Sequence, residues 1–589
     1  MSIRKVCAAC LTAMFAAGAA TALQAAEPAK TAPSTFKPGT YTATVNGHNA
    51  PVTVKVTVSK NRIEKIDTSK NLETIGVGQV ALKLMTDKII KYQSLGVDAI
   101  TGASISSFAV LSGVEKCLEQ AGGDMDKLGE QVEKHPAGTK TYDADVVVIG
   151  GGGSGLATAI AAYQAGAKKV IVIEKLGYLG GSTNVSEGAL NAVDPKRQGK
   201  QGIEDSFEKF YDQTMKGGHN RNNPELVKVL CENSNDAVQW LIKLGGNFND
   251  VGFMGGATNK RCHRPTGGAA VGPEVVKTLY NAVEARKIDL RTDSQVVDLI
   301  VKNGAVAGVK VKDEDGKVYE INSKAVVNAA GGFAGNNAMV SKIIPRLKGF
   351  ATTNHPGATG DGLLLSEKVK AAFVDMDQIQ THPTVVETTG VMVTEAVRGN
   401  GAVLINKEGK RFFDELNTRD AVSAAILKQT TGHAYMFFDD DVRKSLKAIE
   451  GYIKMPGMVI QGKDLDEVAK NMGVPAANLK ATMAQYAKDQ AAGKDSCCGR
   501  TKMERPLTKA PYYAILVTPA VHHTMGGVKI NTKAEVINVD GKVIPGYFAA
   551  GEVTGGVHGG NRLGGNAQAD IIVFGRIAGN SATAYVKAH

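Results

Sequence analysis

A glycine motif between two expected strands constrains this chain more than any other feature. Asp145 is followed by a continuous apolar run over residues 146–149, which is typical of a buried parallel strand. The chain then reads Gly150-x-Gly152-x-x-Gly155 before a helical stretch, and a second apolar strand ends at Glu174. Glycines at this spacing allow a tight turn and let a pyrophosphate approach the helix N-terminus, while the acid accepts from a ribose hydroxyl. An ordinary glycine turn is the alternative, but the complete strand–helix–strand–acid context predicts a dinucleotide site.

Two further segments favour FAD over NAD as the dinucleotide. The stretch that follows the second strand is rich in glycine around Ser182, Thr183 and Gly188. Near the C-terminus, Glu552 follows a short strand, where a carboxylate suits contact with a flavin ribityl chain or ribose.

The first 26 residues have the layout of a secretory signal peptide. Arg4 and Lys5 precede an apolar run over 6–23, and small residues follow. A membrane anchor is the alternative, but the run is short and rich in alanine. We therefore expect a periplasmic protein that does not span the membrane, with a mature N-terminus between Leu23 and Glu27.

Charge and cysteine content exclude several classes of protein. The formal net charge is +11, but the lysines are scattered, so we expect no nucleic-acid partner and a mild attraction for anionic substrates. The cysteines outside the first 26 residues show no disulfide framework and no zinc spacing, so no metal site is expected. The sequence contains no C-x-x-C-H motif for a c-type haem, so a redox enzyme of this sequence must receive electrons through another cofactor.

Four sequence blocks resemble one enzyme family. They contain Gly-Ala-Thr-Gly-Asp-Gly at 357–362, Thr-Glu-Ala-Val-Arg-Gly-Asn-Gly at 394–401, His-His-Thr-Met-Gly-Gly at 522–527 and a glycine-rich block at 551–567. Together they resemble the soluble fumarate reductase flavoproteins of the flavocytochrome c type, within the wider fumarate reductase, succinate dehydrogenase and aspartate oxidase group. The resemblance extends over about 143–589.

This resemblance implies an α/β architecture with a Rossmann-type, doubly wound FAD domain, into which an α+β clamp is inserted. The expected units are a signal peptide at 1–26, a small α/β FMN-binding domain at 36–121, a linker at 122–140, the first part of the FAD domain at 141–376, the clamp at 377–523 and the return to the FAD domain at 524–589.

The resemblance also assigns roles to individual residues. Arg419 matches the family's proton donor, and Glu395 and Arg398, which stand three residues apart and so share a helix face, match its proton relay. Without the resemblance, an ion pair between Arg419 and Asp420 would be the simpler interpretation of that arginine.

The substrate and cofactor residues follow in the same way. His382 with Thr394 matches the groups that hold one substrate carboxylate, and His522 with Arg562 those that hold the other. Met392 and Gly565 complete the substrate site. The expected FAD contacts are Gly150, Gly152, Gly155, Glu174, Ser182, Thr183, Gly188, Asp361, Glu552 and Ala567.

FAD is expected to bind without a covalent bond. Membrane-bound relatives attach FAD through a histidine in a Ser-His-Thr segment. The matching stretch here is Gly181-Ser182-Thr183-Asn184 and contains no histidine.

A second flavin is expected in the N-terminal domain. The segment from Asp98 to Ser104 resembles the attachment motif of FMN-binding domains, in which a flavin transferase joins the FMN phosphate to a hydroxyl, here that of Ser104. The alternative is a plain helix N-cap formed by Thr101 or Ser104. Covalent FMN would replace haem as the relay to FAD and would take electrons from an external donor, such as a quinol-linked cytochrome.

We therefore expect a flavin-dependent reductase that transfers hydride to the C=C bond of a small unsaturated carboxylate, with fumarate as the first candidate. Urocanate, acrylate, methacrylate or a cinnamate would require the same chemistry. A flavin-binding electron carrier with an inactive reductase half is a rival from another class. The complete set of Arg419, Glu395 and Arg398 argues against that rival.

Overall fold

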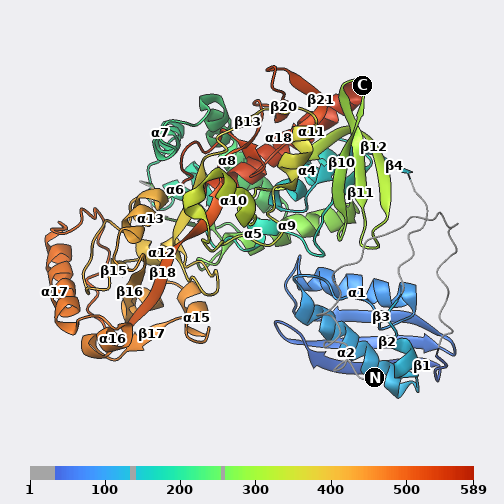
Figure 1. Ribbon diagram of the computed structural model, residues 1–589, viewed down its shortest axis with the longest axis horizontal. Helices are drawn as coiled ribbons and strands as arrows, with labels where there is room; N and C mark the ends of the chain where they lie inside the picture. The colour runs from blue at the N-terminus through green and yellow to red at the C-terminus, as the bar shows by residue number, and fades with distance from the viewer. Residues whose placement is uncertain (1–33, 133–140, 254–258) are drawn as a thin grey trace.

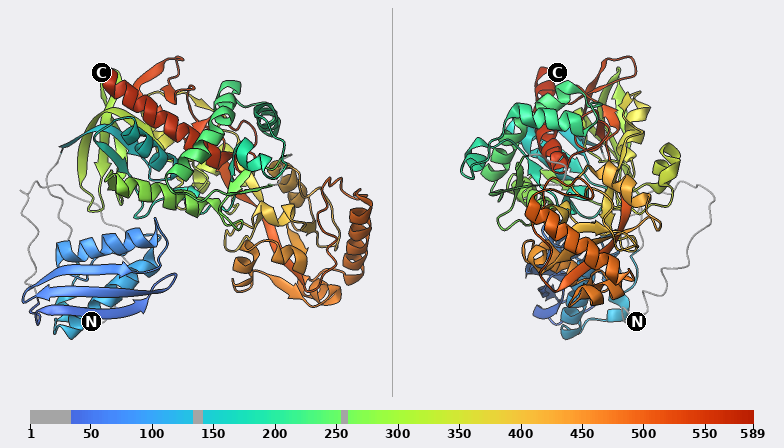
Figure 2. Two further views of the ribbon diagram at one scale, coloured as in Figure 1. Left: turned by 180° about the vertical axis from the view of Figure 1, so that it is seen from behind. Right: turned by 90° about the vertical axis from the view of Figure 1, so that its left-hand side faces the viewer.

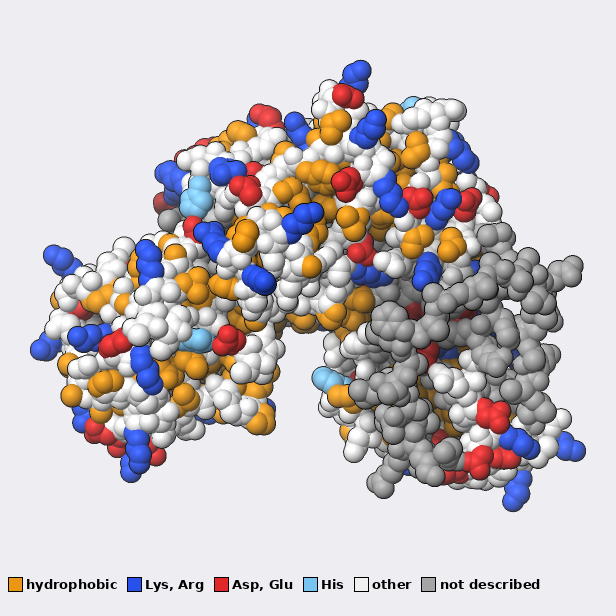
Figure 3. Space-filling view, viewed as in Figure 1, with side chains coloured by type: hydrophobic (Ala, Val, Ile, Leu, Met, Phe, Trp, Pro, Cys, Tyr) orange, Lys and Arg blue, Asp and Glu red, His pale blue; other side chains and the backbone are white. Residues whose placement is uncertain are grey.

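Three lobes make up the protein in the computed structural model, which describes residues 34–132, 141–253 and 259–589. An N-terminal lobe and an inserted lobe project from the same side of a larger central lobe (Figures 1 and 2). Open space separates the two projecting lobes in the space-filling view (Figure 3). The expected signal peptide lies outside the described residues.

The N-terminal lobe is a three-stranded antiparallel sheet with helices packed on it. The strands are β1 (Gly39–Asn46), β2 (Pro51–Ser59) and β3 (Arg62–Lys70), in the order β1-β2-β3. The valines at alternate positions of β2 are all buried, as expected for a sheet with one covered face. That cover consists of α1 (Gly78–Tyr92) and α2 (Ser104–Gln120), and a short helix, α3 (Met125–Leu128), follows.

The central lobe contains an eight-stranded mixed sheet. Its main path runs β10 (Gln295–Lys302), β11 (Ala305–Lys312), β12 (Val318–Asn328), β4 (Thr141–Ile149), β5 (Val170–Ile173) and β9 (Asp289–Arg291), while β21 (Val543–Ala549) pairs with β12 and β20 (Glu535–Ile537) with β21. The strands from β12 to β9 are parallel, and β10, β11 and β12 are antiparallel. All four residues of β5 are buried, which matches its continuous apolar sequence.

Helices cover the parallel part of this sheet. The crossover helix α4 (Gly153–Gln164) connects β4 to β5 and packs against the C-terminal helix α18 (Asn566–Ala588). The two helices approach closely, because a Cβ on Gly579 would lie 2.4 Å from the carbonyl oxygen of Thr158. The remaining helices of this lobe are α5 (Gly181–Asn184), α6 (Pro195–Gly199), α7 (Phe207–Gly217), α8 (Pro224–Lys243), α9 (Val271–Ala285), α10 (Asn337–Ile343) and α11 (Asp361–Lys368).

Two small three-stranded sheets also belong to the central lobe. One has the order β6 (Leu190–Asn191), β8 (Cys262–Arg264) and β7 (Asp250–Gly252). The other has the order β13 (Phe373–Val374), β19 (Gly527–Lys529) and β22 (Thr554–Gly555).

The inserted lobe, which we call the clamp lobe, has its own sheet and its own hydrophobic core. The sheet order is β14 (Ile379–Val385), β18 (Tyr512–Thr524), β16 (Ala434–Asp439) and β15 (Val403–Ile405), and β17 (Ile460–Gly462) also pairs with β18. The long strand β18 runs from this lobe towards the central lobe (Figure 1). The helices are α12 (Glu395–Gly399), α13 (Arg419–Leu427), α14 (Asp440–Lys444), α15 (Ala448–Ile453), α16 (Leu465–Met472) and α17 (Ala476–Ala492).

The expected fold class is therefore confirmed: a Rossmann-type lobe carries an inserted α+β lobe and follows a small α/β lobe. Within the described residues, no helix is both long enough and apolar enough to cross a bilayer.

Candidate active site

The turn between β4 and α4 accepts only glycine at its critical positions. Gly150 has φ +105°, in the region that favours glycine, and a Cβ there would lie 2.4 Å from the carbonyl oxygen of Ala329. A Cβ on Gly155 would lie 1.9 Å from the carbonyl oxygen of Gly150. Gly152 is the N-cap of α4 and has no capping side chain, and the N–H of Gly153 donates to the Thr183 hydroxyl at 3.3 Å. The positive end of the helix dipole at this turn favours a phosphate.

A cavity of about 100 Å³ follows this turn. Its walls include Gly150, Gly152, Glu174, Asp361 and Glu552. The Glu174 carboxylate accepts hydrogen bonds from the N–H of Gly151 at 2.7 Å and of Leu176 at 2.8 Å, and burial raises its pKa. At the start of α11, Asp361 binds the Lys175 ammonium group at 2.9 Å. Gly155 lies beneath the turn rather than on the wall.

A larger cavity of about 530 Å³ continues from the first one. Ser182, Thr183 and Glu552 line both cavities, and Gly188 and Ala567 line the larger one. The smaller cavity is lined by Gly152 and Gly153 at the N-terminus of α4, where the phosphates of a dinucleotide would lie. The residues present therefore fit FAD.

The larger cavity also brings together the expected substrate and catalytic residues. They come from both the clamp and the central lobe, and they are His382, Met392, Thr394, Glu395, Arg419, His522, Arg562 and Gly565. Arg398 is buried behind this wall, with 1% of its surface exposed.

Two neighbouring strands place the two expected histidines side by side. His382 lies on β14 and His522 on β18, and their ring centroids are 5.1 Å apart. Burial and the nearby Arg419 lower the pKa of both histidines well below the usual value, so both rings are neutral. The Nδ1 atom of His382 accepts from the N–H of Thr384 at 3.3 Å, which places the proton on Nε2. That buried Nε2–H has no partner among the described residues and is therefore available to a ligand.

His522, which is half-buried, and the buried Arg562 provide further polar groups. Nδ1 of His522 hydrogen-bonds to the hydroxyl of Thr353 at 2.7 Å, which orients the ring. Burial and the charge of Arg419 lower the pKa of Arg562 to about 9, still high enough for a cation at neutral pH. Its Nε is buried and finds no acceptor in the described part of the chain. Such groups favour an acceptor-rich, anionic ligand.

Arg419 and Glu395 form a close buried pair at the cavity wall. Nε of Arg419 donates to Oε1 of Glu395 at 2.6 Å, and Nη2 of Arg398 lies 3.6 Å from the same oxygen. Burial alone would raise the pKa of Glu395, but the two arginines lower it to about 2. At rest Glu395 is therefore an anion, and the protons of this group of three residues reside on the two arginines. Asp420, the alternative partner of Arg419, instead contacts His219 at 2.9 Å.

Two short helices position Glu395, Arg398 and Arg419. Glu395 and Arg398 occupy one face of the five-residue helix α12, whose N-cap is Thr394. Arg419 is the first residue of α13. The i,i+3 adjacency expected from the sequence is therefore present in the structure.

Gln380 was missed by sequence analysis, although it connects the two arginines that line the cavity. Its Oε1 accepts from Nη1 of Arg419 at 3.0 Å, and its Nε2 donates to the carbonyl oxygen of Arg562 at 2.8 Å. No motif contains this residue, and its role follows only from the position of β14.

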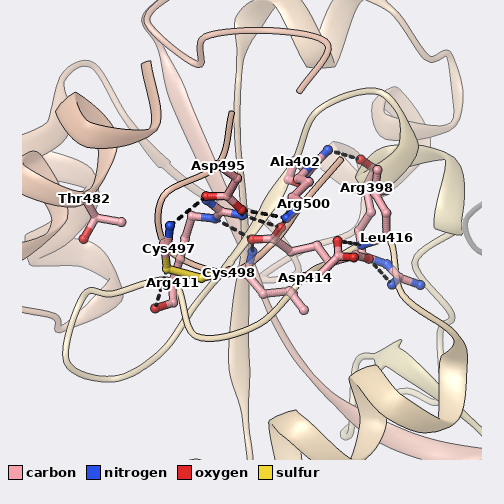
Figure 4. A network of polar contacts seen from close by, with 12 residues as sticks. Arg398, Ala402, Arg411, Asp414, Leu416, Thr482, Asp495, Cys497, Cys498 and Arg500 are labelled. Atoms are coloured by element: carbon pink, nitrogen blue, oxygen red, sulfur yellow. Dashed lines mark hydrogen bonds and ion pairs between the residues drawn. A yellow bond between two sulfur atoms is a disulfide. The ribbon is translucent and has the colours of Figure 1, made fainter. Parts of the chain in front are cut away.

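A buried ionic network lies behind Arg398 (Figure 4). Nη1 of Arg398 donates to the carbonyl oxygen of Glu415 at 2.7 Å, and Arg500 donates to the carbonyl oxygen of Arg398 at 2.8 Å. The Glu415 carboxylate binds Arg411 at 2.7 Å and Arg500 at 3.3 Å, and Arg411 also binds Asp495 at 2.9 Å. The network holds both the backbone and the guanidinium of Arg398.

One disulfide in this network was not foreseen from the cysteine spacing. The adjacent residues Cys497 and Cys498 are joined (Figure 4). Their loop turns around the Asp495 carboxylate, which accepts from the N–H of Cys497 at 3.1 Å and of Arg500 at 2.9 Å. A search for separated cysteine pairs overlooks neighbours that such a turn brings together.

A second histidine beside His522 also faces the cofactor space. His523 lines the larger cavity and lies 3.4 Å from the Glu552 carboxylate, and burial lowers its pKa to about 4. Glu552 also accepts from the N–H of Thr524 at 3.0 Å. Sequence analysis gave His523 no role, because a lone histidine more often has a structural role.

Ser104 lies where the N-terminal lobe meets the central lobe. It is exposed and is the first residue of α2, whose N-cap, Ala103, forms no side-chain cap. Just before it, a Cβ on Gly102 would lie 2.4 Å from the ring of Tyr178, and one on Gly177 would lie 2.2 Å from Ile100. The loop before Ser104 therefore contacts the segment that connects Glu174 to the larger cavity.

Comparison with known proteins identifies both nucleotide-binding regions. Residues 145–567 match the FAD binding domain family, and residues 47–119 match the FMN-binding domain family. The chain is 51% identical over 444 residues to a fumarate reductase (cytochrome) of Shewanella frigidimarina, covering 75% of this chain and 77% of that relative.

Two relatives extend through the N-terminal lobe as well. An NADH:fumarate oxidoreductase of Klebsiella pneumoniae (strain 342) is 41% identical over 93% of this chain, which spans 58% of that relative's length. A urocanate reductase of Eggerthella lenta is 37% identical over 92% of both chains. Among solved structures, the open conformation of a flavocytochrome c3 fumarate reductase is similar, with a TM-score of 0.65 and 43% identity, covering 79% of this chain and 81% of the other.

Proposed function

This chain belongs to the FAD-binding family of fumarate-reductase-type flavoprotein oxidoreductases, and we propose that it reduces fumarate to succinate. Its fumarate reductase and urocanate reductase relatives share the flavin-dependent reduction of the C=C bond of an unsaturated carboxylate. The observation that carries the choice of fumarate is the arrangement of two adjacent donor pairs in one cavity, His382 with Thr394 and His522 with Arg562.

A four-carbon trans-dicarboxylate would use both donor pairs at once. One carboxylate would accept from His382 Nε2 and Thr394, and the other from His522 and Arg562. A monocarboxylate would leave one pair without acceptors, at a cost of about 1–3 kcal/mol for each unpaired donor. Since about 1.4 kcal/mol corresponds to a factor of ten, kcat/KM should favour the dicarboxylate by at least about tenfold.

The proposed proton supply uses Arg419, Glu395 and Arg398. When bound, FAD supplies the hydride for one alkene carbon. Arg562 and His522 would stabilise the negative charge that builds towards the carboxylate, because they are preorganised donors in a buried site. Arg419 would give a proton to the neighbouring carbon. A free arginine is a poor acid, so the proton must be replaced at once through Glu395 from Arg398.

We also propose that a flavin transferase attaches FMN to Ser104 through a phosphoester. The uncapped N-terminus of α2 supports this, because free N–H groups favour a phosphate there. Ile105 and Phe108 are 55% and 44% exposed on the same helix and could cover an apolar ring.

The position of this loop supports a relay from FMN to FAD. The loop before Ser104 contacts Tyr178, and Ser182 in the cavity wall follows four residues later. Four residues span at most about 14 Å. Electrons from an external donor, such as a quinol-linked cytochrome, would enter at FMN and cross this short segment.

The periplasm is the proposed location. The support is the arrangement of Arg4, Lys5 and the apolar run before Leu23, which lies outside the described residues. Protein isolated from the periplasmic fraction should begin between Leu23 and Glu27. A mature chain that retains Met1 would contradict export by cleavage.

Urocanate is the second candidate substrate. The observation that favours it is the similarity to a urocanate reductase over 92% of both chains. Its imidazole could replace the second carboxylate at one donor pair.

A screen of unsaturated acids with a reduced viologen as donor tests the proposal. We expect kcat/KM for fumarate to exceed that for acrylate, methacrylate and cinnamate by at least about tenfold. Faster reduction of urocanate or of a monocarboxylate at low concentration would overturn the choice of fumarate. A His382→Ala variant should lose far more activity with fumarate than with acrylate.

A further inference from the structure

The hydroxyl of Tyr452 connects the two lobes beside the substrate cavity. Tyr452 lies in α15 of the clamp lobe, and only 2% of its surface is exposed. Its hydroxyl lies 2.5 Å from Oε2 of Glu187 in the central lobe and accepts from the N–H of Thr394 at 3.1 Å. Both Glu187 and Thr394 line the larger cavity.

The direction of this hydrogen-bond chain is fixed. Burial and the neighbouring Glu187 raise the pKa of the Tyr452 phenol, which therefore keeps its proton. The backbone N–H of Thr394 can only donate, so the phenol accepts there and donates its own proton to Glu187. One hydroxyl thus satisfies a group from each lobe.

The bond to Thr394 controls more than one residue of the site. Thr394 is the N-cap of α12, and its side chain accepts from the N–H of Ala396. This helix has only five residues, and they include Glu395 and Arg398. Fixing the N–H of the N-cap therefore fixes the start of the helix that carries the relay, as well as the hydroxyl of Thr394.

The bond to Glu187 depends on how the clamp lobe lies over the central lobe. Glu187 follows α5 of the central lobe, whereas α15 and α12 belong to the clamp lobe. The bond can form only when the two lobes are brought together over the cavity.

We propose that Tyr452 is a positioning residue: by bridging Glu187 and Thr394 across the two lobes, it couples seating of the clamp to the carboxylate site at Thr394 and so contributes to the preference for a dicarboxylate. The substrate part of this inference depends on the proposed function. The bridge itself does not.

The test is Tyr452→Phe, which keeps the ring and removes the hydroxyl. We expect kcat/KM for fumarate to fall about tenfold, because a buried donor and a buried acceptor lose their partner. Acrylate needs only the other donor pair, so its kcat/KM should fall less than about threefold. The ratio of the two values is the readout, since general damage to the fold would lower both equally.

Two further variants serve as controls. Tyr486→Phe removes a hydroxyl from another buried tyrosine of the clamp lobe, one that has no hydrogen-bond partner among the described residues, and it should leave both substrates unchanged. Glu187→Gln keeps an acceptor oxygen for the phenol and should retain most of the preference, whereas Glu187→Ala should lose it. Combining Glu187→Ala with Tyr452→Phe should add little to either single change.

Hydrogen exchange at the Thr394 amide tests the bridge without any substrate. Tyr452→Phe in the FAD-loaded protein should speed exchange of this amide at least about tenfold, and Tyr486→Phe should not. Unchanged exchange would overturn the bridge, and an equal loss with fumarate and acrylate would overturn its role in preference. If the wild type prefers another unsaturated acid as substrate, the proposed function is overturned instead. The exchange measurement would still show whether Tyr452 holds the Thr394 amide.

Discussion

Replacement of Arg419 tests the proposed proton supply most directly. Arg419 is 7% exposed and forms a 2.6 Å hydrogen bond with Glu395 and a 3.0 Å bond with Gln380. Arg419→Ala removes the proton donor and both bonds. Arg419→Lys keeps a charge and a proton but cannot reproduce the planar fork of the guanidinium.

The expected size of the effect follows from these contacts. General acid catalysis is typically worth about 10²–10⁴-fold, so the alanine variant should lose at least about 100-fold in kcat. Removing one partner of a buried ion pair costs about 3–5 kcal/mol when the other charge stays uncompensated. Arg398 still faces Glu395 at 3.6 Å, so we expect a loss of stability near about 3 kcal/mol. The lysine variant should lose less stability and keep a trace of turnover.

Turnover per bound FAD is the quantity to measure. Steady-state reduction of fumarate by reduced viologen gives kcat, the flavin absorbance of the denatured sample gives FAD content, and urea unfolding gives stability. Dividing kcat by FAD content separates lost chemistry from lost cofactor.

Arg261→Ala is the matched control. Arg261 is also a buried arginine, with 1% of its surface exposed, and it binds the buried Asp205 at 2.6 Å in the central lobe, away from the cavity wall. This variant should lose comparable stability while keeping turnover per FAD. Turnover of Arg419→Ala within tenfold of the wild type would refute the assignment of the proton donor.

Three further predictions follow from single positions. Ser104→Ala, made with an active flavin transferase, should lack the added mass of FMN and Ser104→Thr should keep it; retention by the alanine variant would exclude this attachment site. Gly155→Ala should abolish FAD binding, because its Cβ would lie 1.9 Å from a carbonyl oxygen, and a full FAD load would contradict the turn assignment. Burial lowers the pKa of His355 and of His523 to about 4, so the unfolded chain binds more protons between pH 6.5 and 4. The free energy of unfolding should therefore decrease as the pH is lowered through that window, by up to about 1.4 kcal/mol per pH unit for each histidine. Urea unfolding at pH 7 and at pH 5 measures this change, and His523→Gln should reduce the slope.

The sequence alone determined the features that depend on neighbouring residues. The strand before Gly150, the turn and helix after it, and the strand that ends at Glu174 were all predictable, because hydrophobic period and glycine spacing are local properties. The same holds for Glu395 and Arg398 on one helix face. The family was predictable because its motifs are long and stand in order, and the matched domains confirm it.

Only the tertiary structure decided which side chains meet. Arg419 pairs with Glu395, 24 residues away, rather than with the adjacent Asp420, because α13 and α12 bring those two side chains to the same wall. Gln380 enters the site through its place on β14, and Tyr452 reaches Glu187 across 265 residues only because the clamp lobe lies over the central lobe. Such partners depend on how the lobes and strands pack, which no local spacing encodes.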